Sequence, residues 1–361
     1  MDTRKKTDDI MRVSPAFADC SEAIVFCVND SYCPILSVML YSVMEHVSPA
    51  RVYDIVILHR DITPVNQKIL QNMGAEKNNV SIRFLNVAAL ISDYTLFVGG
   101  KAVFTIDAYL RLLIPYVLDD VYQKALYLDA DMLALADVGE LLDTNVDDFL
   151  LASSRDLTGL AEYYDSSSMH KRNRDEVLKL EKPDDYFIDG MLVLNLEAFR
   201  EKYTSDELLE LAASRNWLQH DQDVLNVICN GGKAKILHAQ WDVLKPYHPE
   251  RLPQEYRVEH DEALASPKIV HFGGDDKPWK VTGNPWDDLF WDTAIKTPYY
   301  KAIIYSVIDK ANTSREKMIE KHRNEIESIY ASQTFRAGSM LTWLPRMIRN
   351  AVQKVLPHRN R

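Results

Sequence analysis

The chain contains no hydrophobic segment long enough to cross a lipid bilayer, because none of its uninterrupted apolar runs reaches about 18 residues. The charged residues 1–9 lead into no long apolar run either, so we expect no signal peptide. Cysteine is scarce: the four cysteines show no C-x-x-C spacing, and three of them lie in or near the first apolar run. This pattern predicts reduced, buried thiols in a cytoplasmic protein, with a disulfide as the alternative.

Positive charge is also in short supply, with 42 lysines and arginines against 53 aspartates and glutamates and a formal net charge of -11. That balance argues against broad nucleic-acid binding, so we expect no nucleic acid partner. The exception is the stretch 341–361, which holds basic residues and no acidic ones. With 361 residues, 47% of them hydrophobic, the composition indicates a globular protein of one large α/β domain with additions, or of two domains.

The first half of the chain alternates between two hydrophobic patterns. Short apolar runs predict strands, and apolar residues at helical spacing predict helices. The predicted strands are 23–28, 53–58, 80–85 and the run before Asp129, and the predicted helices are 33–46, 64–73 and 107–117, the last interrupted at Pro115. Thr63 is the expected cap of the second helix. This alternation predicts an α/β fold with a mostly parallel, doubly wound sheet and helices on both faces.

The second half is less regular. We predict a strand at 191–196 and helices at 205–214 and 221–229. The proline-containing stretch 245–267 reads as a long loop or small insertion. Beyond Pro298 the pattern becomes helical and charged, and then basic and amphipathic.

Two carboxylates, Asp129 and Asp131, stand in the most informative stretch of the chain, KALYLDADMLAL at 124–135. They follow a predicted buried strand, at the edge where ligands bind in open α/β sheets. Side chains two apart on an extended chain point the same way, so both carboxylates can face one cation. Carboxylate oxygens suit Mg²⁺ or Mn²⁺, ions that also hold substrate phosphates. The stretch predicts a metal–diphosphate site, and a pair of solvated turn acids is the alternative.

Several separated motifs are similar, in the same order, to those of one enzyme family. They are IVFCVNDSY at 24–32, YLRL at 109–112, LYLDAD at 126–131, YFIDGMLVLNL at 186–196, HDQDVLN at 220–226 and VHFGGDDKPW at 270–279. Over this span the chain resembles glycosyltransferase family 8, including bacterial lipopolysaccharide and lipooligosaccharide galactosyl- and glucosyltransferases. The resemblance implies a GT-A fold with a Rossmann-like sheet. It also implies metal-dependent transfer of galactose or glucose from a UDP-sugar, with retention at the anomeric carbon.

The resemblance also implies which residues bind the metal and the donor. A UDP leaving group needs cations aimed at its diphosphate. The implied metal ligands are Asp129, Asp131 and His271, with Mn²⁺ or Mg²⁺ as the cofactor. The positions that match donor-binding residues are Asn29, Asp30, Tyr32, Arg111, Asp129, Ala130, Asp131, Asp189, Gly190, Gly274 and Lys277. Taken alone, His271 would be read as a surface-loop histidine and Arg111 as an arginine that extends to the surface.

Three residues match the family's positions around the reacting sugar. Asp156 matches an acid that contacts the donor's hydroxyls, and Asp221 and Gln222 match the pair nearest the anomeric centre. Gln222 is neutral and therefore a poor nucleophile, so we expect attack from the side of the leaving group, with Gln222 stabilising positive charge. Asp221 as nucleophile is the alternative mechanism. Both residues could instead serve only as the N-terminal residues of a helix.

The chain departs from the family pattern at two places. Asn29 stands where an acid is usual, and Ile188 and Asp189 stand where the family carries an asparagine and a small residue. The asparagine typically touches the donor sugar, so the resemblance does not carry over the identity of the hexose. These departures leave a catalytically weak UDP-sugar-binding protein as the alternative function. A nucleotidyltransferase would need a glycine-rich basic loop after the first strand, and 29–34 has neither glycine nor lysine.

We divide the chain into an N-terminal extension at 1–22, a GT-A catalytic domain at 23–297 and a helical, basic, amphipathic segment at 298–361. In 340–361 large apolar residues alternate with arginines, which predicts peripheral contact with the inner face of the plasma membrane. A packed C-terminal helix is the alternative. The expected partners are a UDP-sugar donor and a saccharide or lipid-linked glycan acceptor.

Overall fold

The computed structural model describes residues 12–18, 20–98, 105–331, 345 and 347. The chain divides into two compact units, one ending at Ile303 and the other beginning at Ile304. The domain boundaries predicted from the sequence, after residues 22 and 297, stay predictions.

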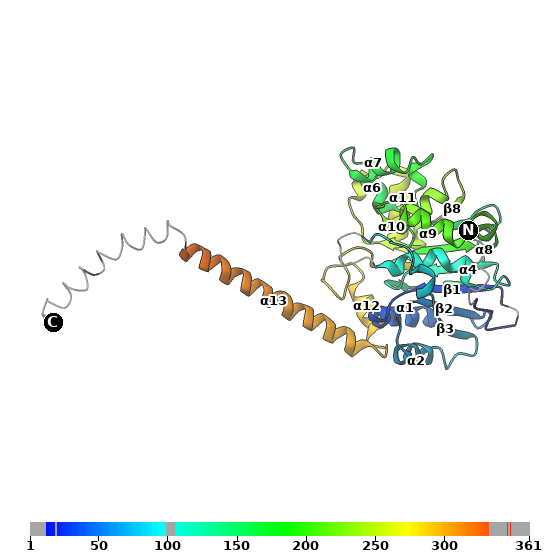
Figure 1. The fold of residues 1–361 in the computed structure, drawn as a ribbon, viewed down its shortest axis with the longest axis horizontal. Helices are drawn as coiled ribbons and strands as arrows, with labels where there is room; N and C mark the ends of the chain where they lie inside the picture. Colours follow the sequence, from blue (N-terminus) through cyan, green and yellow to red (C-terminus); the bar gives the residue numbers. More distant parts are fainter. Residues whose placement is uncertain (1–11, 19, 99–104, 332–344, 346, 348–361) are drawn as a thin grey trace. The chain divides into compact units, whose positions relative to one another are not determined.

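A seven-stranded sheet forms the centre of the first unit (Figure 1). Its strand order is β3-β2-β1-β4-β7-β6-β8. The strands are β1 (Glu22–Cys27), β2 (Tyr53–His59), β3 (Val80–Asn86), β4 (Lys124–Leu128), β6 (Leu151–Ser154), β7 (Met191–Asn195) and β8 (Ala234–Leu237). All pairs are parallel except those that β7 makes with β4 and β6. The predicted mostly parallel α/β sheet is therefore confirmed.

A smaller sheet of three strands follows the order β5-β10-β9. Its strands are β5 (Met132–Ala134), β9 (Val243–Leu244) and β10 (Ile269–His271). The antiparallel pairing of β10 with β5 places His271 opposite Met132, the residue that follows Asp131. This register brings two segments that are far apart in the sequence to the carboxyl end of β4.

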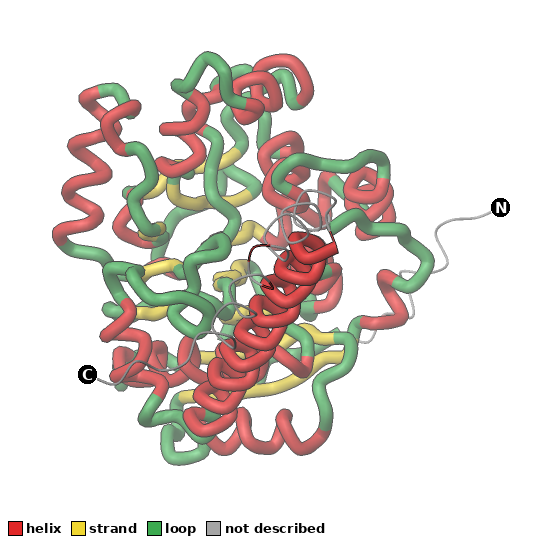
Figure 2. Tube along the Cα trace, turned by 90° about the vertical axis from the view of Figure 1, so that its left-hand side faces the viewer, coloured by secondary structure: helices red, strands yellow, loops and turns green. Residues whose placement is uncertain are grey.

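Helices surround the strands of the first unit, as the tube in Figure 2 shows. The α-helices are α1 (Cys33–His46), α2 (Pro64–Met73), α3 (Ala88–Ile91), α4 (Ile114–Val117), α5 (Gly139–Leu142), α6 (Leu157–Tyr163), α7 (Met169–Arg172), α8 (Leu196–Lys202), α9 (Ser205–Ala213), α10 (His220–Ile228), α11 (Gln254–Ala265) and α12 (Asp287–Ala294). Shorter 3₁₀ and π elements are η3 (Asp30–Tyr32), η4 (Ile106–Leu113), η5 (Asn173–Val177), η6 (Pro183–Asp185), η7 (Ala239–Trp241) and η8 (Pro249–Arg251).

The central strand β1 is buried on both faces, which explains why its residues 23–26 are apolar without interruption. Ala23 and Val25 of β1 join a large core cluster that includes residues of η4, α4, α8, α9 and α10. Ile24 and Phe26 alternate with them on the opposite face and are equally buried. The prediction of helices on both faces is consistent with this double burial.

Two local predictions hold only in part. The stretch 245–267, predicted as a long loop or small insertion, is not simply a loop, because it contains the twelve-residue helix α11. Only one residue of α11, Ala263, is buried, so the helix carries almost no periodic apolar signal. The stretch 107–117 is not one helix: it forms the 3₁₀ segment η4 and then α4, whose start is marked by Pro115 in its first turn.

The predicted cap at Thr63 is confirmed, since its side chain accepts a hydrogen bond from the amide of Asn66. The four cysteines are free thiols, as predicted.

The described part of the second unit consists mainly of the long helix α13 (Tyr300–Ala331), which begins in the last residues of the first unit. No helix among the described residues is both long and apolar enough to cross a membrane. The segment predicted to contact the membrane, 340–361, lies outside the described residues apart from Pro345 and Met347.

Candidate active site

The carboxyl end of β4 places both predicted acids at one edge of the sheet. The amide of Asp129 still bonds to the carbonyl of Gly190 across the strand pair, at 2.8 Å, and the chain then turns into β5. The carbonyl of Asp131 accepts a hydrogen bond from the amide of Phe272, so the next strand pair starts there. His271 is the last residue of β10, and its Nε2 atom faces both acids.

These three side chains form a cluster that could hold a metal ion. One ligand atom from each of Asp129, Asp131 and His271 lies within 4.8 Å of the others. The Nε2 atom of His271 is 3.5 Å from an Asp131 oxygen and 3.8 Å from an Asp129 oxygen. The sequence-based interpretation of His271 as a surface-loop histidine does not fit this position, since the residue is buried.

A fourth residue, Asp242, holds His271 in place and was missed in the sequence. Its carboxylate bonds to Nδ1 of His271 at 2.8 Å, and its side chain is fully buried. A carboxylate on Nδ1 selects the tautomer whose Nε2 lone pair is free for a metal. Asp242 stands between the apolar residues Trp241 and Val243, which is the same signal that drew attention to Asp129.

Gly190 allows this close packing. A Cβ atom at residue 190 would lie 2.6 Å from the His271 ring and 2.8 Å from an oxygen of Asp242, closer than real side chains come. The predicted donor-binding residue Gly190 thus lies directly against the His271–Asp242 pair.

The ionisation states in the cluster reflect crowding of negative charge. Burial raises the pKa of Asp129, and Asp131 adds to this effect while Arg111 opposes it. Burial also acts to raise the pKa of Asp131, but Lys277 and His271 outweigh it, so this pKa lies below its ordinary value. Burial acts to lower the pKa of His271, but Asp242 and Asp131 raise it well above its ordinary value. A divalent cation would relieve the same crowding.

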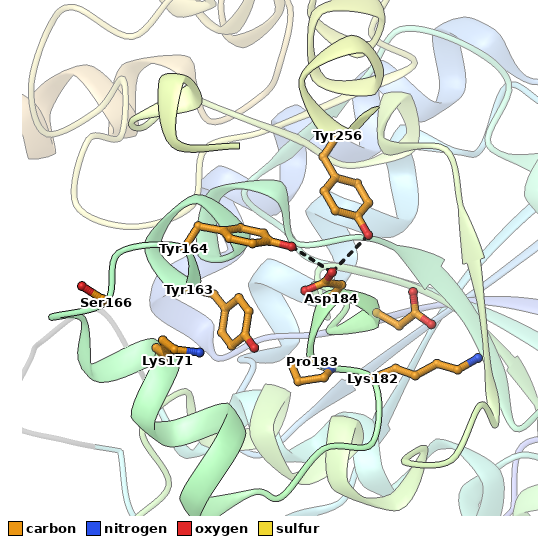
Figure 3. Close-up of a pocket in the computed structure, with 9 residues that line it drawn as sticks. Tyr163, Tyr164, Ser166, Lys171, Lys182, Pro183, Asp184 and Tyr256 are labelled. Atoms are coloured by element: carbon orange, nitrogen blue, oxygen red, sulfur yellow. Dashed lines mark hydrogen bonds between the residues drawn. The ribbon is translucent and has the colours of Figure 1, made fainter. Parts of the chain in front are cut away.

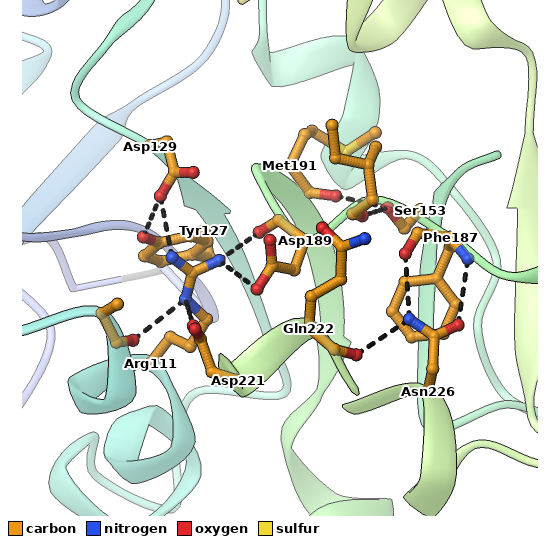
Figure 4. A network of polar contacts seen from close by, with 12 residues as sticks. Arg111, Tyr127, Asp129, Ser153, Phe187, Asp189, Met191, Asp221, Gln222 and Asn226 are labelled. Atoms are coloured by element: carbon orange, nitrogen blue, oxygen red, sulfur yellow. Dashed lines mark hydrogen bonds and ion pairs between the residues drawn. The ribbon is translucent and has the colours of Figure 1, made fainter. Parts of the chain in front are cut away.

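Arg111 is the centre of a second group of acids (Figure 4). Its guanidinium lies within 3.0 Å of oxygens of three carboxylates, those of Asp129, Asp189 and Asp221. It also donates to the carbonyls of Ala108 and Asp189 and lies 4.3 Å above the ring of Tyr127. Arg111 is therefore buried among acids and does not extend to the surface. Direct contact between Arg111 and a diphosphate stays a prediction.

Lys277 and Tyr32 border Asp131 on its other side. The ammonium of Lys277 donates to the Asp131 carboxylate and to the carbonyl of Phe272, and Lys277 is buried. The Tyr32 hydroxyl is 3.5 Å from the same carboxylate. Between His271 and Lys277 the backbone passes through Gly274, whose φ of 73° is a conformation that L side chains rarely adopt.

Asp156 and Gln222 meet each other directly. The Gln222 amide donates to an Asp156 oxygen at 3.2 Å, and Asp156 also caps α6 by accepting from the amide of Gly159. Asp221 and Gln222 lie in the first turn of α10, as expected for helix-start residues, but Asp221 pairs with Arg111 rather than with the helix. Sequence reasoning missed Arg174, a buried arginine 3.7 Å from Asp156 and 4.1 Å above the Tyr186 ring.

The segment after β1 carries Asn29 and Asp30 in different roles. One Asp30 oxygen accepts from the amide and hydroxyl of Thr63 and from the Asn66 side chain, which ties it to the start of α2. Asn29 donates at 3.0 Å to Asp107, a buried acid that also pairs with Arg60. The family pattern has an acid at residue 29, and in this chain the carboxylate of Asp107 lies in hydrogen-bond contact with the Asn29 side chain instead.

The fold and this site define a class of protein. The mostly parallel sheet, with paired acids at the end of β4, is the GT-A architecture of glycosyltransferases. The structure resembles that of WbbM, a bifunctional glycosyltransferase, with a TM-score of 0.73 and 26% identity over 82% of this chain and 53% of the WbbM chain. It also resembles the galactosyltransferase LgtC, with a TM-score of 0.62 and 20% identity over 77% of this chain and 96% of LgtC.

The sequence profile of glycosyl transferase family 8 matches residues 23–283, so the chain belongs to this family. Curated relatives include the general stress protein A of Bacillus subtilis, 26% identical over 74% of this chain and 91% of that protein. Another is the lipopolysaccharide 1,2-glucosyltransferase of Escherichia coli, 23% identical over 64% of this chain and 63% of that protein. The predicted family and fold are confirmed.

The position of Asp242 predicts that it controls metal affinity. Changing Asp242→Asn removes the negative charge behind His271, and the dissociation constant for Mn²⁺, measured by electron paramagnetic resonance of the free ion, should rise roughly 10- to 100-fold. Asp54→Asn is the matched control, because Asp54 is a buried acid that pairs with Arg83 near the start of β2. It should lower stability without changing Mn²⁺ affinity. Equal Mn²⁺ affinity in Asp242→Asn and wild type would contradict the role of Asp242.

The position of Arg111 predicts a stability defect that depends on pH. Arg111→Met leaves three carboxylates without their shared cation, and the free energy of unfolding in urea should fall by about 3–5 kcal/mol at neutral pH. The pKa values of Asp129 and Asp189 already lie above their ordinary values and rise further without Arg111, so the variant's native state binds more protons and gains stability as the pH falls. The defect should be smaller at pH 5 than at pH 8. Adding Asp189→Asn should recover part of it, and a pH-independent defect would contradict the charge-balance explanation.

Proposed function

We propose that this chain is a metal-dependent, retaining hexosyltransferase that moves galactose or glucose from a UDP-sugar to a glycan or glycolipid acceptor. The observation that carries the proposal is the convergence of Asp129, Asp131 and His271, with Asp242 behind the histidine and Lys277 beside Asp131. The two carboxylates and the imidazole are ligands for a divalent ion, and the lysine supplies positive charge for a diphosphate.

The charge balance of the site supports a divalent ion. Among the described residues, the four carboxylates of Asp129, Asp131, Asp189 and Asp221 contact two side chains of the lysine and arginine type, Arg111 and Lys277. When bound, Mn²⁺ or Mg²⁺ would neutralise charge on the leaving diphosphate. Lys277 would add a positive charge at the same place, and Gly274 would let the backbone approach the phosphates closely.

The nucleoside would lie at the end of β1, where ligands bind in such sheets. Asp107 accepts from the Asn29 NH₂ group and so fixes the amide, whose oxygen accepts from Ser31 and keeps a second lone pair. That lone pair can accept the N3–H of uracil. Asp107 would thereby preserve uridine recognition without an acid at residue 29.

The surroundings of the reacting carbon favour attack from the side of the leaving group. The carboxylate of Asp221 is engaged by Arg111, 2.8 Å away, which weakens it as a nucleophile. The Gln222 NH₂ group donates to Asp156, so its amide oxygen is the end left to face a positively charged sugar. In this mechanism Asp156 positions Gln222 and binds sugar hydroxyls, and the diphosphate takes the proton of the acceptor.

Metal-dependent UDP release tests this function. The purified protein with Mn²⁺ should release UDP from UDP-galactose or UDP-glucose, and a chelator should abolish the release. Asp131→Asn should lower turnover at least ~100-fold, the size of the loss of a main charge stabiliser. Asp261→Asn, at an exposed residue of α11, is the control that should keep full activity. No UDP release from any nucleotide sugar, with UDP still bound, would favour the alternative of a catalytically weak UDP-sugar-binding protein.

We also propose that the acceptor is lipid-linked and that 340–361 contacts anionic membrane. The support is the basic, amphipathic sequence of this segment together with the lipopolysaccharide enzyme among the relatives. Deleting 340–361 should abolish sedimentation with vesicles that contain anionic lipid, and UDP release should persist because every proposed donor contact precedes residue 278. Vesicle binding that survives the deletion would contradict the prediction.

A further inference from the structure

A cavity of about 580 Å³ opens at the far end of α6, away from the cap residue Asp156 (Figure 3). Its walls come from the end of α6, from α7, from η6 and from α11. Three tyrosines, Tyr163, Tyr164 and Tyr256, surround it together with Pro183, Asp184 and Lys171. None of these residues belongs to the metal cluster or to the acids around Arg111.

The tyrosine rings form the apolar part of the cavity. Tyr163 and Tyr164 meet nearly at right angles, with ring centroids 5.4 Å apart and planes at 80°, so they make a corner. Tyr164 is 40% exposed, which leaves its ring accessible to a ligand. Aromatic faces carry partial negative charge and attract the polarised C–H groups of a flat apolar surface. A sugar ring presents such a surface on one side and hydroxyl groups around its edge.

Asp184 supplies the polar part. One of its oxygens accepts from the hydroxyls of Tyr164, at 2.9 Å, and Tyr256, at 3.3 Å. A carboxylate offers about four acceptor positions in all, so Asp184 can also accept from a ligand's hydroxyl groups. Two lysines, Lys171 and Lys182, and two acids, Asp184 and Asp185, line the cavity, and their charges cancel. A neutral, hydroxyl-rich ligand therefore fits better than a phosphate or a cation.

Arg155 connects this cavity to the proposed donor site. Its guanidinium lies 4.7 Å above the Tyr256 ring and bonds to Asp185 at 2.9 Å, and the next residue in the chain is Asp156. The amide of Asp156 bonds in turn to the carbonyl of Tyr186, which follows η6 directly. The seven residues of α6 separate Asp156 from the cavity by about 10 Å, at 1.5 Å per residue. A short oligosaccharide bridges such a distance.

We propose that this cavity is a saccharide subsite that binds a neutral sugar unit of the acceptor glycan, remote from the unit that receives the hexose. The role as acceptor subsite rests on the proposed function, whereas saccharide binding by the cavity does not. Binding energy from a remote unit of the acceptor would hold the glycan while its reacting end reaches the donor.

The test measures saccharide binding and donor hydrolysis separately on the full chain. Saturation-transfer NMR is recorded with glucose and galactose and with four tetrasaccharide probes: maltotetraose, cellotetraose, chitotetraose and β-1,4-galactotetraose. At least one tetrasaccharide should bind, and Tyr164→Ala should raise its dissociation constant about three- to tenfold, the worth of one aromatic contact. Tyr164→Phe keeps the ring and should stay close to wild type. Tyr305→Ala, at an exposed tyrosine of α13, is the control and should change nothing.

The outcomes separate this proposal from the proposed function. UDP release without acceptor should be equal in wild type and Tyr164→Ala, because Tyr164 follows α6 at the end opposite Asp156 and bonds to Asp184 of the cavity. Tetrasaccharide binding that depends on Tyr164, without UDP release in wild type, would support the subsite and overturn the transferase. UDP release with no Tyr164-dependent binding of any of the four tetrasaccharides would overturn the subsite and leave the transferase standing. The subsite is equally overturned if Tyr305→Ala weakens binding as much as Tyr164→Ala.

Discussion

One arginine determines how the proposed donor site is assembled. Asp129 follows β4, Asp189 precedes β7 and Asp221 lies in the first turn of α10, and all three carboxylates are held by the guanidinium of Arg111. Buried carboxylates repel one another strongly unless a cation lies between them, and a planar guanidinium can serve several acids at fixed angles. Three segments of the chain are thus brought together by one side chain from η4. The metal cluster adjoins this group through Asp129, so its geometry depends on Arg111 as well.

The metal cluster itself depends on the close packing of small and polar groups. His271 fits between the two acids because its other nitrogen is bound by Asp242 and because residue 190 has no side chain. The register of the β5–β10 pairing determines the position of His271, because it places His271 opposite Met132 and so next to Asp131. The three side chains are therefore oriented by the protein itself, which would lower the ordering cost of binding the proposed ion.

The sequence predicted those features that depend on local pattern or on separated motifs, and it failed where long-range packing decides. The strands β1 to β4 and the helix capped by Thr63 follow from short-range rules. The acids after Leu128 were recognisable because a carboxylate next to a buried strand costs free energy unless it has a partner. Asp242 has apolar neighbours like those of Asp129, but its role follows from its contact with His271, which only the fold creates. Arg174 likewise meets Asp156 only through packing. The helix α11 was missed because it buries one residue only and so lacks an apolar stripe.

The departure from the family pattern at residues 188 and 189 is integrated into the structure. Ile188 is buried, its amide bonds to the carbonyl of Ser154, and its carbonyl accepts the hydroxyl of Ser153. Asp189 contacts Arg111 with both its carbonyl and its carboxylate. Burial raises the pKa of Asp189 well above its ordinary value; Arg111 acts to lower this pKa, and the nearby Asp221 and Asp129 act to raise it. Asp189 thus has a cationic partner and a second contact that fix its position, and Ile188 is packed and hydrogen-bonded. A buried acid without such contacts would be costly to keep, so the residues at this departure form an integral part of the proposed donor site.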